Sequence, residues 1–247
     1  MKKVILSPLT GIRFFAAISS LKNFFSNLNY MQIVIWGASG HALVVSEIIR
    51  LINQYKIIGF LDEVNLHLHG KNFCGSLILG GREKFDQLHD DGVQYSLIAI
   101  GNCQARLELS NLVEQNGFRL ATTVHPQAII ACDIAIGAGT VICAGAVICA
   151  GAKVGKNVII NTSSSVDHEC VIEDGVHIGP GVHIGGRTTI KQGAWIGIGA
   201  TVSDRITIGA NSIIGAGAVV VRDIPPGVVA YGVPAKVIRN IDSSVQY

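Results

Sequence analysis

The sequence is poor in charged residues and has no long apolar run. Asp, Glu, Lys and Arg make up only 15% of its 247 residues, the formal net charge is +2, and Lys and Arg are scattered rather than clustered. This balance argues against the basic patch typical of nucleic-acid-binding domains. Because no run of about 18 apolar residues occurs, neither a transmembrane helix nor stable membrane insertion is expected.

The cysteines lack the spacing of known metal or redox motifs. None of the six forms a CxxC pair, which argues against zinc-ribbon and thioredoxin-like interpretations. We expect buried free thiols in a reducing cytoplasm, since an unpaired Cys is mostly a small core residue. The six cysteines are Cys74, Cys103, Cys132, Cys143, Cys149 and Cys170.

Glycine is abundant, and from residue 130 onward an aliphatic residue recurs every six positions. The chain has 29 glycines, about 12% against an average of about 7%, which predicts many tight turns. The repeat positions are all Ile or Val: Ile130, Ile136, Ile142, Ile148, Val154, Ile160, Val166, Ile172, Ile178, Ile184, Ile190, Ile196, Val202, Ile208, Ile214 and Val220.

Each hexad predicts one short strand and one turn, so that three hexads form one triangular coil of a parallel β-helix over residues 129–224. The β-branched residues point into the prism, and identical positions of successive coils stack as ladders. One predicted ladder consists of Ile130, Ile148, Val166, Ile184, Val202 and Val220.

Residues 31–124 show a different pattern, in which apolar strands alternate with amphipathic helices. This order predicts an α/β domain with a parallel, Rossmann-like sheet covered by helices. The predicted strands are 32–36, 56–61, 95–100 and 119–124, and the predicted helices are 41–53, 82–90 and 104–116.

The turn after the first strand has the composition of a phosphate-binding turn. It reads Gly37-Ala38-Ser39-Gly40-His41 and opens a helix, where backbone N–H groups can meet an anion. It is not the GxGxxG fingerprint, which makes a nicotinamide cofactor unexpected. The alternatives are a nucleotide-sugar pocket and a turn that merely packs the helix on the sheet. Residues at the same predicted edge complete the candidate substrate site: Asp62, Gly101, Asn102 and Arg106.

One stretch of the repeat, 160–177, departs from Gly and Ala and carries titratable groups. His168 falls at a turn between Asp167 and Glu169, and a histidine beside a carboxylate can act as a general base near neutral pH. The alternative is an ordinary exposed turn histidine. His177 and His183 lie one hexad apart, which predicts that they occupy adjacent faces of the coil.

The GASGH turn, the NTSSSVDHEC stretch, the hexads and the closing GVPAK segment together resemble the NeuD/PglD-type sugar acetyltransferases. The resemblance covers about residues 31–240 and implies a left-handed β-helix, acetyl-CoA as co-substrate without a metal, and a cytoplasmic homotrimer with active sites shared between subunits. It implies that His168 is the base and Glu169 its orienting group. Asn161 and His177 match further site positions, and Gly186 matches a turn whose amide faces the thioester carbonyl. The resemblance gives these coenzyme candidates: Gly197, Ala200, Gly215, Ala216 and Lys236.

The acceptor implied by the resemblance is a sugar, in one of two forms. One form is N-acetylation of a nucleotide-linked amino sugar; the other is O-acetylation of a sialic-acid-like sugar, both in bacterial surface-glycan synthesis. Asp62 is followed by Glu63, Val64 and Asn65, without a nearby base for a diphosphate, which keeps O-acetylation open.

Two hypotheses from other classes compete with an acetyltransferase. A carbonic-anhydrase-like metalloenzyme on this fold needs three converging histidines, but the intervals between His168, His177 and His183 are too short to stack them one coil apart. A non-enzymatic solenoid scaffold would carry regular Thr arrays, whereas Thr is scattered here.

The segment 1–30 forms an extension of uncertain status, and residues 225–247 form a tail with the GVPAK segment. Leu9–Ile18 resembles the opening of membrane acyltransferases of another family, and the segment lacks the features of a signal peptide. It is interpreted as a fusion remnant, as an amphipathic surface helix, or as sequence upstream of a true start at Met31.

Overall fold

The first strand, β1 (Met31–Trp36), is buried on both faces and lies at the centre of a parallel sheet. Ile33 and Ile35 point into one core, and Val34 and Trp36 point into the other. An uninterrupted apolar strand is what a parallel sheet with helices on both faces requires. The computed structural model describes residues 30–241, so the predicted extension 1–30 lies, apart from its last residue, outside the described residues.

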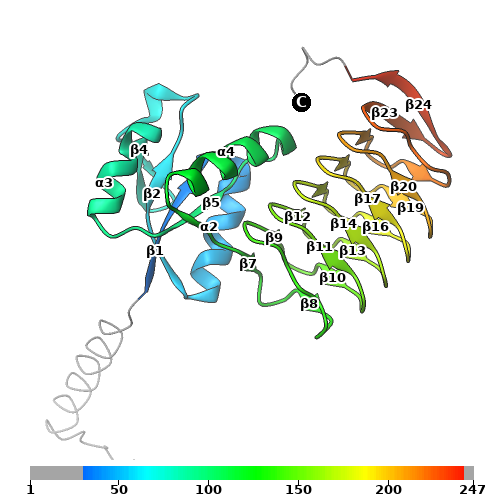
Figure 1. The fold of residues 1–247 in the computed structure, drawn as a ribbon, viewed down its shortest axis with the longest axis horizontal. Coiled ribbons are helices and arrows are strands. Elements are labelled where there is room, and N and C mark those ends of the chain that lie inside the picture. The colour runs from blue at the N-terminus through cyan, green and yellow to red at the C-terminus, as the bar shows by residue number, and fades with distance from the viewer. Residues whose placement is uncertain (1–29, 242–247) are drawn as a thin grey trace, which may run out of the picture. The chain divides into compact units, whose positions relative to one another are not determined.

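The sheet has the order β3-β4-β2-β1-β5-β6, and all its pairings are parallel except that between β3 and β4. Helix α2 packs against the Ile33 face, and helices α3 and α4 lie on the Trp36 side (Figure 1). The α/β elements are α2 (Gly40–Ile52), β2 (Tyr55–Leu61), η1 (Leu66–Leu68), β3 (Asn72–Phe73), β4 (Ser76–Gly80), η2 (Arg82–Lys84), α3 (Phe85–Asp90), β5 (Tyr95–Ile98), α4 (Cys103–Gln115) and β6 (Arg119–Leu120).

The structure differs from the sequence expectation at two places in this domain. The hairpin of β3 and β4 was not predicted. In the structure, Cys74 and Gly75 form its turn and both have positive φ. The predicted strand 119–124 is two strands: β6 ends the α/β sheet, whereas β7 (Thr123–Val124) pairs with β9 of the solenoid. The predicted strand is divided because the chain passes from one sheet to the next at this point.

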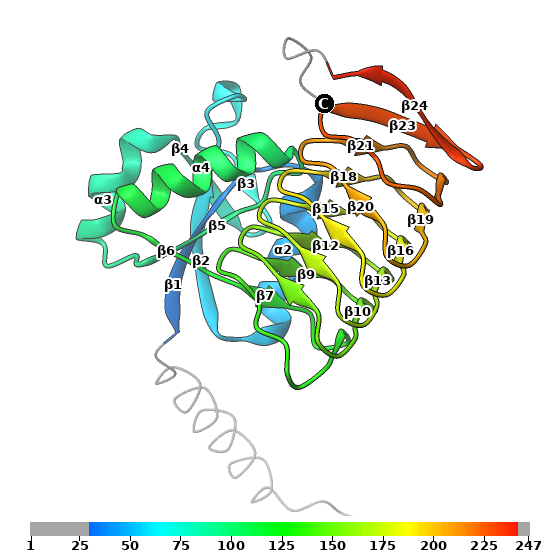
Figure 2. The ribbon, with the colours of Figure 1, turned by 45° about the vertical axis from the view of Figure 1, so that its right-hand side comes forward.

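Residues from β7 onward form the predicted parallel β-helix, with short strands on three sheets (Figure 2). Sheet C contains β7, β9 (Val141–Ile142), β12 (Ile159–Ile160), β15 (His177–Ile178), β18 (Trp195–Ile196), β21 (Ile213–Ile214), β23 (Val228–Gly232) and β24 (Ala235–Asn240). Sheet D contains β8 (Ile129–Ile130), β10 (Val147–Ile148), β13 (Ser165–Val166), β16 (His183–Ile184), β19 (Thr201–Val202) and β22 (Val219–Val220). Sheet E contains β11 (Lys153–Val154), β14 (Val171–Ile172), β17 (Thr189–Ile190) and β20 (Thr207–Ile208).

The predicted aliphatic ladder is confirmed by the strand register. Ile130 pairs with Ile148, and the series continues coil by coil to Val220 on sheet D. The inward side chains fill one continuous core along the prism. His177 lies on sheet C and His183 on sheet D, as the hexad spacing predicts. Several turns need the left-handed region and place Gly or Asn there, for example Gly145 and Asn157.

We expect Ile178→Ala to lower the free energy of unfolding by about 2–5 kcal/mol, the usual range for truncating a fully buried aliphatic side chain. Ile178 is 0% exposed and stacks between Ile160 and Ile196 in the core. The cavity that its truncation leaves is therefore closed to solvent. Urea denaturation measures the change. Val64→Ala, at a side chain that is 87% exposed, should change the midpoint little, and equal shifts for the two variants would contradict the assigned core.

The α/β domain and the solenoid share buried side chains. Val141 and Cys143 of the first coil belong to the same apolar cluster as Ile33 and Ala42. At the other end, β23 continues sheet C and forms an antiparallel hairpin with β24, which carries the end of the GVPAK segment.

The expectation of buried thiols is right for three of the six cysteines and wrong for the other three. Those that are buried are Cys103, Cys143 and Cys170. Cys74 and Cys149 are half-buried and Cys132 is exposed, since they fall at turns or loops rather than in the core.

Candidate active site

His168 lies at the corner of the coil between β13 and β14, with its ring held by a neighbouring carboxylate. Its Nδ1 is 3.1 Å from Oε2 of Glu169, and its backbone N–H donates to Asp167 Oδ1 at 2.7 Å. Because a carboxylate only accepts, this contact places the proton of a neutral ring on Nδ1 and the lone pair on Nε2. The side chain is half exposed, at 51%, so Nε2 is accessible to a substrate.

Glu169 is held in turn by an arginine from the next coil. Arg187 Nε donates to Glu169 Oε2 at 2.8 Å, and this hydrogen bond, followed by that from His168, lowers the pKa of Glu169 below its ordinary value. Arg187 was not predicted as a site residue. It occupies the position equivalent to Glu169 in the following coil, so the repeat itself contains the signal that places it there.

Because Gly186 has no side chain, the ring of His168 can occupy the space next to its Cα. A Cβ at this position would lie 2.6 Å from His168 Nε2, closer than carbon and nitrogen approach without displacement. The backbone N–H of Gly186 donates to no residue in the described part of the chain. The structure therefore brings together the predicted base and the predicted oxyanion donor, one coil apart at the same corner.

A second cluster is built around His177 of β15. Its ring stacks on Trp195 with a centroid distance of 5.4 Å and an interplanar angle of 3°. Its Nδ1 is 3.2 Å from Gly101 O, and its Nε2 is 3.4 Å from Asn161 Nδ2. The ring of His41 lies 6.5 Å away. Trp195, the strand partner of His177 in the next coil, was not predicted as a site residue.

Both histidines of this cluster are uncharged near neutral pH. Burial, and then the positive charge of Arg106, lowers the pKa of His177 to about 3. The same two causes, in the same order, lower the pKa of His41 to about 4. The Nε2 atom of His41 is buried without a hydrogen-bond partner among the described residues.

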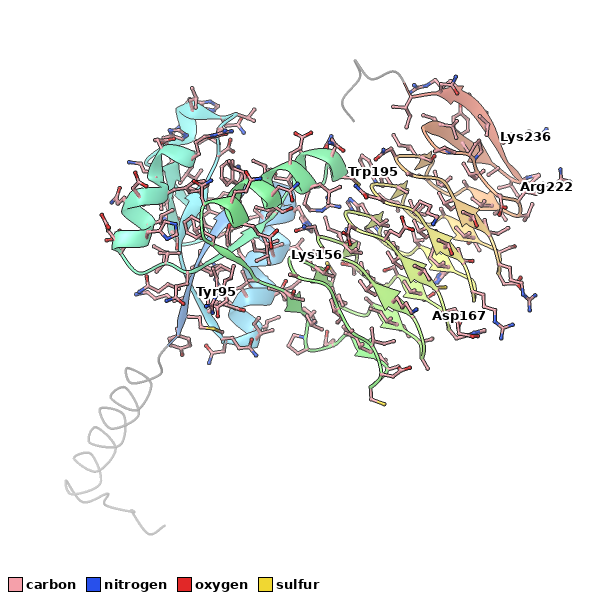
Figure 3. All side chains as sticks on the ribbon, in the orientation of Figure 1. Tyr95, Lys156, Asp167, Trp195, Arg222 and Lys236 are labelled. Atoms are coloured by element: carbon pink, nitrogen blue, oxygen red, sulfur yellow. The ribbon has the colours of Figure 1, made fainter. Side chains whose placement is uncertain are left out.

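The two clusters lie at different edges of one solenoid. His168 and Glu169 lie at the corner that follows β13 of sheet D. His177 lies on sheet C itself, and Asn161 lies at the corner that follows β12 of sheet C. Figure 3 shows Trp195 next to the α/β domain and Asp167 at another edge of the prism. The four residues that the resemblance grouped as catalytic therefore form two pairs within one chain.

A cavity of about 650 Å³ opens at the carboxyl ends of β1, β2 and β5. The strand order reverses at this point, with β2 on one side of β1 and β5 on the other, which is where ligands bind in open α/β sheets. The predicted residues Gly37, Ser39 and Asp62 line the cavity. At Gly37, φ is +110° and a Cβ would lie 2.8 Å from Ala99 O, so the turn requires glycine.

A cation lines this cavity, contrary to the expectation of none near Asp62. Arg82 Nε and Nη2 each donate at 2.7 Å to the two oxygens of Glu63. Arg82 was not predicted because it is distant from Asp62 in the sequence and returns through the β3–β4 hairpin. Asp62 itself accepts from the backbone N–H groups of Val64 and Asn65; hydrogen bonds from these residues lower its pKa although burial acts to raise it.

The other predicted substrate residues do not line the cavity. Gly40 opens α2 and Asn102 caps α4, accepting from Ala105 N at 2.9 Å. His41 and Gly101 belong to the His177 cluster. Arg106 is fully buried, so the prediction that it touches substrate is wrong.

The coenzyme candidates lie at the corner that follows sheet C. Gly197 and Ala200 follow β18, and Gly215 and Ala216 follow β21. Lys236 is exposed on β24. This corner carries Asn161 two coils before Gly197 and three coils before Gly215, and it is separate from the corner of His168.

Neither a candidate metal centre nor a membrane-spanning helix occurs in residues 30–241. This part of the chain contains no group of three or more His, Cys, Asp or Glu side chains that could hold a metal ion. His168, His177 and His183 lie on a corner, sheet C and sheet D respectively, so they do not converge. The helices of the same part are too short or too polar to cross a membrane.

Two family descriptions match the chain: residues 32–113 match the PglD N-terminal domain, and residues 187–222 match the bacterial transferase hexapeptide (six repeats). PerB from Caulobacter crescentus, solved with CoA and GDP-perosamine, is 34% identical over 84% of this chain and 97% of that chain, with a TM-score of 0.80. The acetyltransferase domain of PglB from Neisseria gonorrhoeae FA1090, solved with acetyl coenzyme A, is 34% identical over 85% and 100%, with a TM-score of 0.79. WeeI from Acinetobacter baumannii AYE is 29% identical over 84% and 100%, with a TM-score of 0.74.

The solenoid is a left-handed hexapeptide-repeat β-helix, and its CoA-dependent relatives show that the protein is an acyltransferase. With one third of residues identical over nearly the whole length of two of these relatives, the chain belongs to the PglD-type family of sugar acetyltransferases. The PglD part of the predicted resemblance is thereby confirmed.

Proposed function

We propose that this protein transfers acetyl from acetyl-CoA to the amine of a nucleotide-linked amino sugar. The observation that supports this proposal is the cavity beside β1. Its lining includes Gly37 and Ser39 of the turn that precedes His41, and the ring of His41 lies 6.5 Å from that of His177. A nucleoside diphosphate in the cavity would therefore direct its sugar towards the His177 cluster. The relative PerB holds CoA and GDP-perosamine together, which supports the same pairing of substrates here.

In the proposed reaction His168 Nε2 accepts a proton from the attacking amine. Its Nδ1–H donates to Glu169, which stays ionised beside Arg187 and stabilises the imidazolium. The amine forms the new C–N bond at the thioester carbonyl, and the C–S bond breaks. The proton then passes from His168 to the leaving sulfur. The N–H of Gly186, which has no hydrogen-bond partner within residues 30–241, is the proposed donor to the developing oxyanion.

A homotrimer would bring the two clusters together. Asn161 and His168 lie at the two corners that bound strand β13 of sheet D. If sheet D of each subunit faces a threefold axis, the Asn161 corner of one subunit meets the His168 corner of the next. The two ends of the outer face of sheet D support this arrangement because they carry apolar side chains: Ile129, which is 66% exposed, lies beside Val147 at one end, and Val219 lies at the other.

Thiol release from acetyl-CoA, measured with the full chain against UDP-, GDP- and dTDP-linked amino sugars and free sialic acids, tests the proposal. Turnover with a nucleotide-linked amino sugar, and none with the same sugar without its nucleotide, is the expected result. Turnover with sialic acid alone would overturn the proposal in favour of O-acetylation.

We expect Arg82→Ala to raise KM for the nucleotide-linked acceptor about tenfold, equivalent to about 1.4 kcal/mol of binding, because Arg82 is the cation available to a diphosphate in the cavity. KM for acetyl-CoA should not change. Arg50→Ala, at an exposed arginine outside this cavity, is the matched control. Glu63→Gln removes the carboxylate that holds Arg82 and should not weaken binding of the acceptor. A rise in acceptor KM as large as that of Arg82→Ala would assign the binding role to the Glu63 carboxylate instead.

A further inference from the structure

Arg106 of α4 is a fully buried arginine whose hydrogen bonds go mainly to backbone carbonyls. Nε donates to Asn157 O at 2.8 Å and Nη2 to Gly175 O at 2.7 Å, both in the solenoid. Nη1 donates to Ile100 O at 2.8 Å and to Gly101 O at 2.9 Å, both after β5. No salt bridge to Arg106 occurs in the described part of the chain.

A buried cation without a carboxylate is costly, and an apolar side chain could join the same elements at lower cost. The neighbouring pair on α4 already provides such a neutral link, since Asn157 Nδ2 donates to Ser110 Oγ at 2.9 Å. Holding the helix on the solenoid therefore does not account for a full positive charge at this point. Two of the described side chains are affected by both the charge and the hydrogen bonds of Arg106: Cys103, which interacts with it directly, and His177, which it reaches through the Gly101 carbonyl. Of these two, His177 belongs to the candidate site.

Gly101 O connects Arg106 to His177, because it accepts from Arg106 Nη1 and lies 3.2 Å from His177 Nδ1. A carbonyl cannot donate, so the proton of His177 must be on Nδ1 and its lone pair on Nε2. The contact of His177 Nε2 with Asn161 indicates the same tautomer. Asn161 Oδ1 accepts from Thr162 N at 2.8 Å, which turns Asn161 Nδ2 towards His177 Nε2.

We propose that Arg106 is a positioning residue that holds His177 as a neutral imidazole with its lone pair on Nε2, so that an N–H or O–H of the acceptor sugar can replace Asn161 Nδ2 as the donor to this lone pair. Arg106 does this by fixing the Gly101 carbonyl and by adding the effect of its positive charge to that of burial, which disfavours the imidazolium most. The inference rests on the proposed function for the identity of the sugar donor, and on the geometry of this chain for the state of the ring.

The other groups around His177 act in the same direction. His41 from α2 is itself uncharged, with a pKa lowered to about 4 by burial and by Arg106. Cys103 at the start of α4 is a thiol whose pKa is raised by burial. Trp195 and Asn161 carry no charge. A carboxylate that would favour an imidazolium does not appear among the groups that shift the pKa of His177.

Nitrogen NMR of the histidine rings in the full chain tests the state of His177 without any change at Arg106. The signals are assigned by their loss in His177→Gln. Between pH 8 and about pH 5, we expect His177 to be neutral and to carry its proton on Nδ1. A proton on Nε2, or an imidazolium within this range, would overturn the proposal whatever the substrate of the enzyme.

Arg106→Met removes the charge and the hydrogen bonds with little loss of volume. We expect the protonation midpoint of His177 to rise by about one pH unit, and KM for the acceptor to rise about tenfold while KM for acetyl-CoA is unchanged. Ser110→Ala, one helical turn away, loosens the same junction without changing charge and should move neither quantity. Equal effects of the two variants would reduce Arg106 to a link between the domains.

Arg106→Lys covers the case in which Arg106→Met does not fold. It keeps the positive charge but cannot reach four carbonyls, so His177 should stay neutral while acceptor KM rises less than tenfold. Protonation of His177 in this variant near pH 6 would contradict the role of the charge. If the amino-sugar assay fails but the NMR results hold, the acceptor assignment is wrong and the positioning role of Arg106 stands.

Discussion

His168→Ala should lower kcat by roughly 10²–10⁴, the usual contribution of a general base, while the fold and CoA affinity are retained. The imidazole is half exposed at a coil corner and fills no core space, so its loss leaves no cavity. Steady-state kinetics with the acceptor found in the substrate panel measure kcat, and calorimetry measures CoA binding.

The matched control for this variant is His67→Ala, which removes an exposed imidazole from the α/β domain. It should have the activity of the unaltered protein. If His168→Ala turned over at an undiminished rate, His168 would have no part in proton transfer, and the base would have to come from the substrate or from another group at the site.

Gly186→Ala should lower kcat roughly 10–100-fold while changing the free energy of unfolding by less than about 0.5 kcal/mol. The added methyl group would lie 2.6 Å from His168 Nε2 and 2.8 Å from its Cε1, and the ring is free to turn away into solvent. The cost therefore falls on the position of the base rather than on the stability of the coil. Steady-state kinetics and urea denaturation measure the two quantities.

A double-mutant cycle separates this effect from any general damage to the corner. If Gly186→Ala acts only by displacing His168, the variant that carries both substitutions should be no slower than His168→Ala alone. A further loss in the double variant would instead show that the Gly186 amide itself is displaced, as expected if it supplies the oxyanion donor.

The repeat made most of the solenoid predictable. A period of six, with three hexads to a coil, predicted the ladder that begins at Ile130 and Ile148, and the structure has this register. The same periodicity places Arg187 above Glu169 and Trp195 above His177. Both residues were predictable in principle, because each is the equivalent of a predicted site residue in the following coil.

Other features depend on contacts that no period encodes. Arg82 reaches Glu63 through an unpredicted hairpin, and Arg106 is buried at a junction between two parts of the chain that are distant in sequence. The interval between His168 and His177 showed only that the two do not stack. It did not reveal which corner or sheet each occupies, since that depends on how the coil is divided among three sheets.

The buried junction between the α/β domain and the solenoid has a consequence for acceptor choice. Val141 and Cys143 share a core with Ile33, and Arg106 fastens α4 to two successive coils. The cavity beside β1 and the His177 cluster are therefore at a fixed separation. If the acceptor is the nucleotide-linked amino sugar proposed above, a compound with the right base but a spacer of a different length between nucleotide and amine would occupy the cavity as an inhibitor and would not be acetylated. Molecular length would then itself be a criterion of specificity.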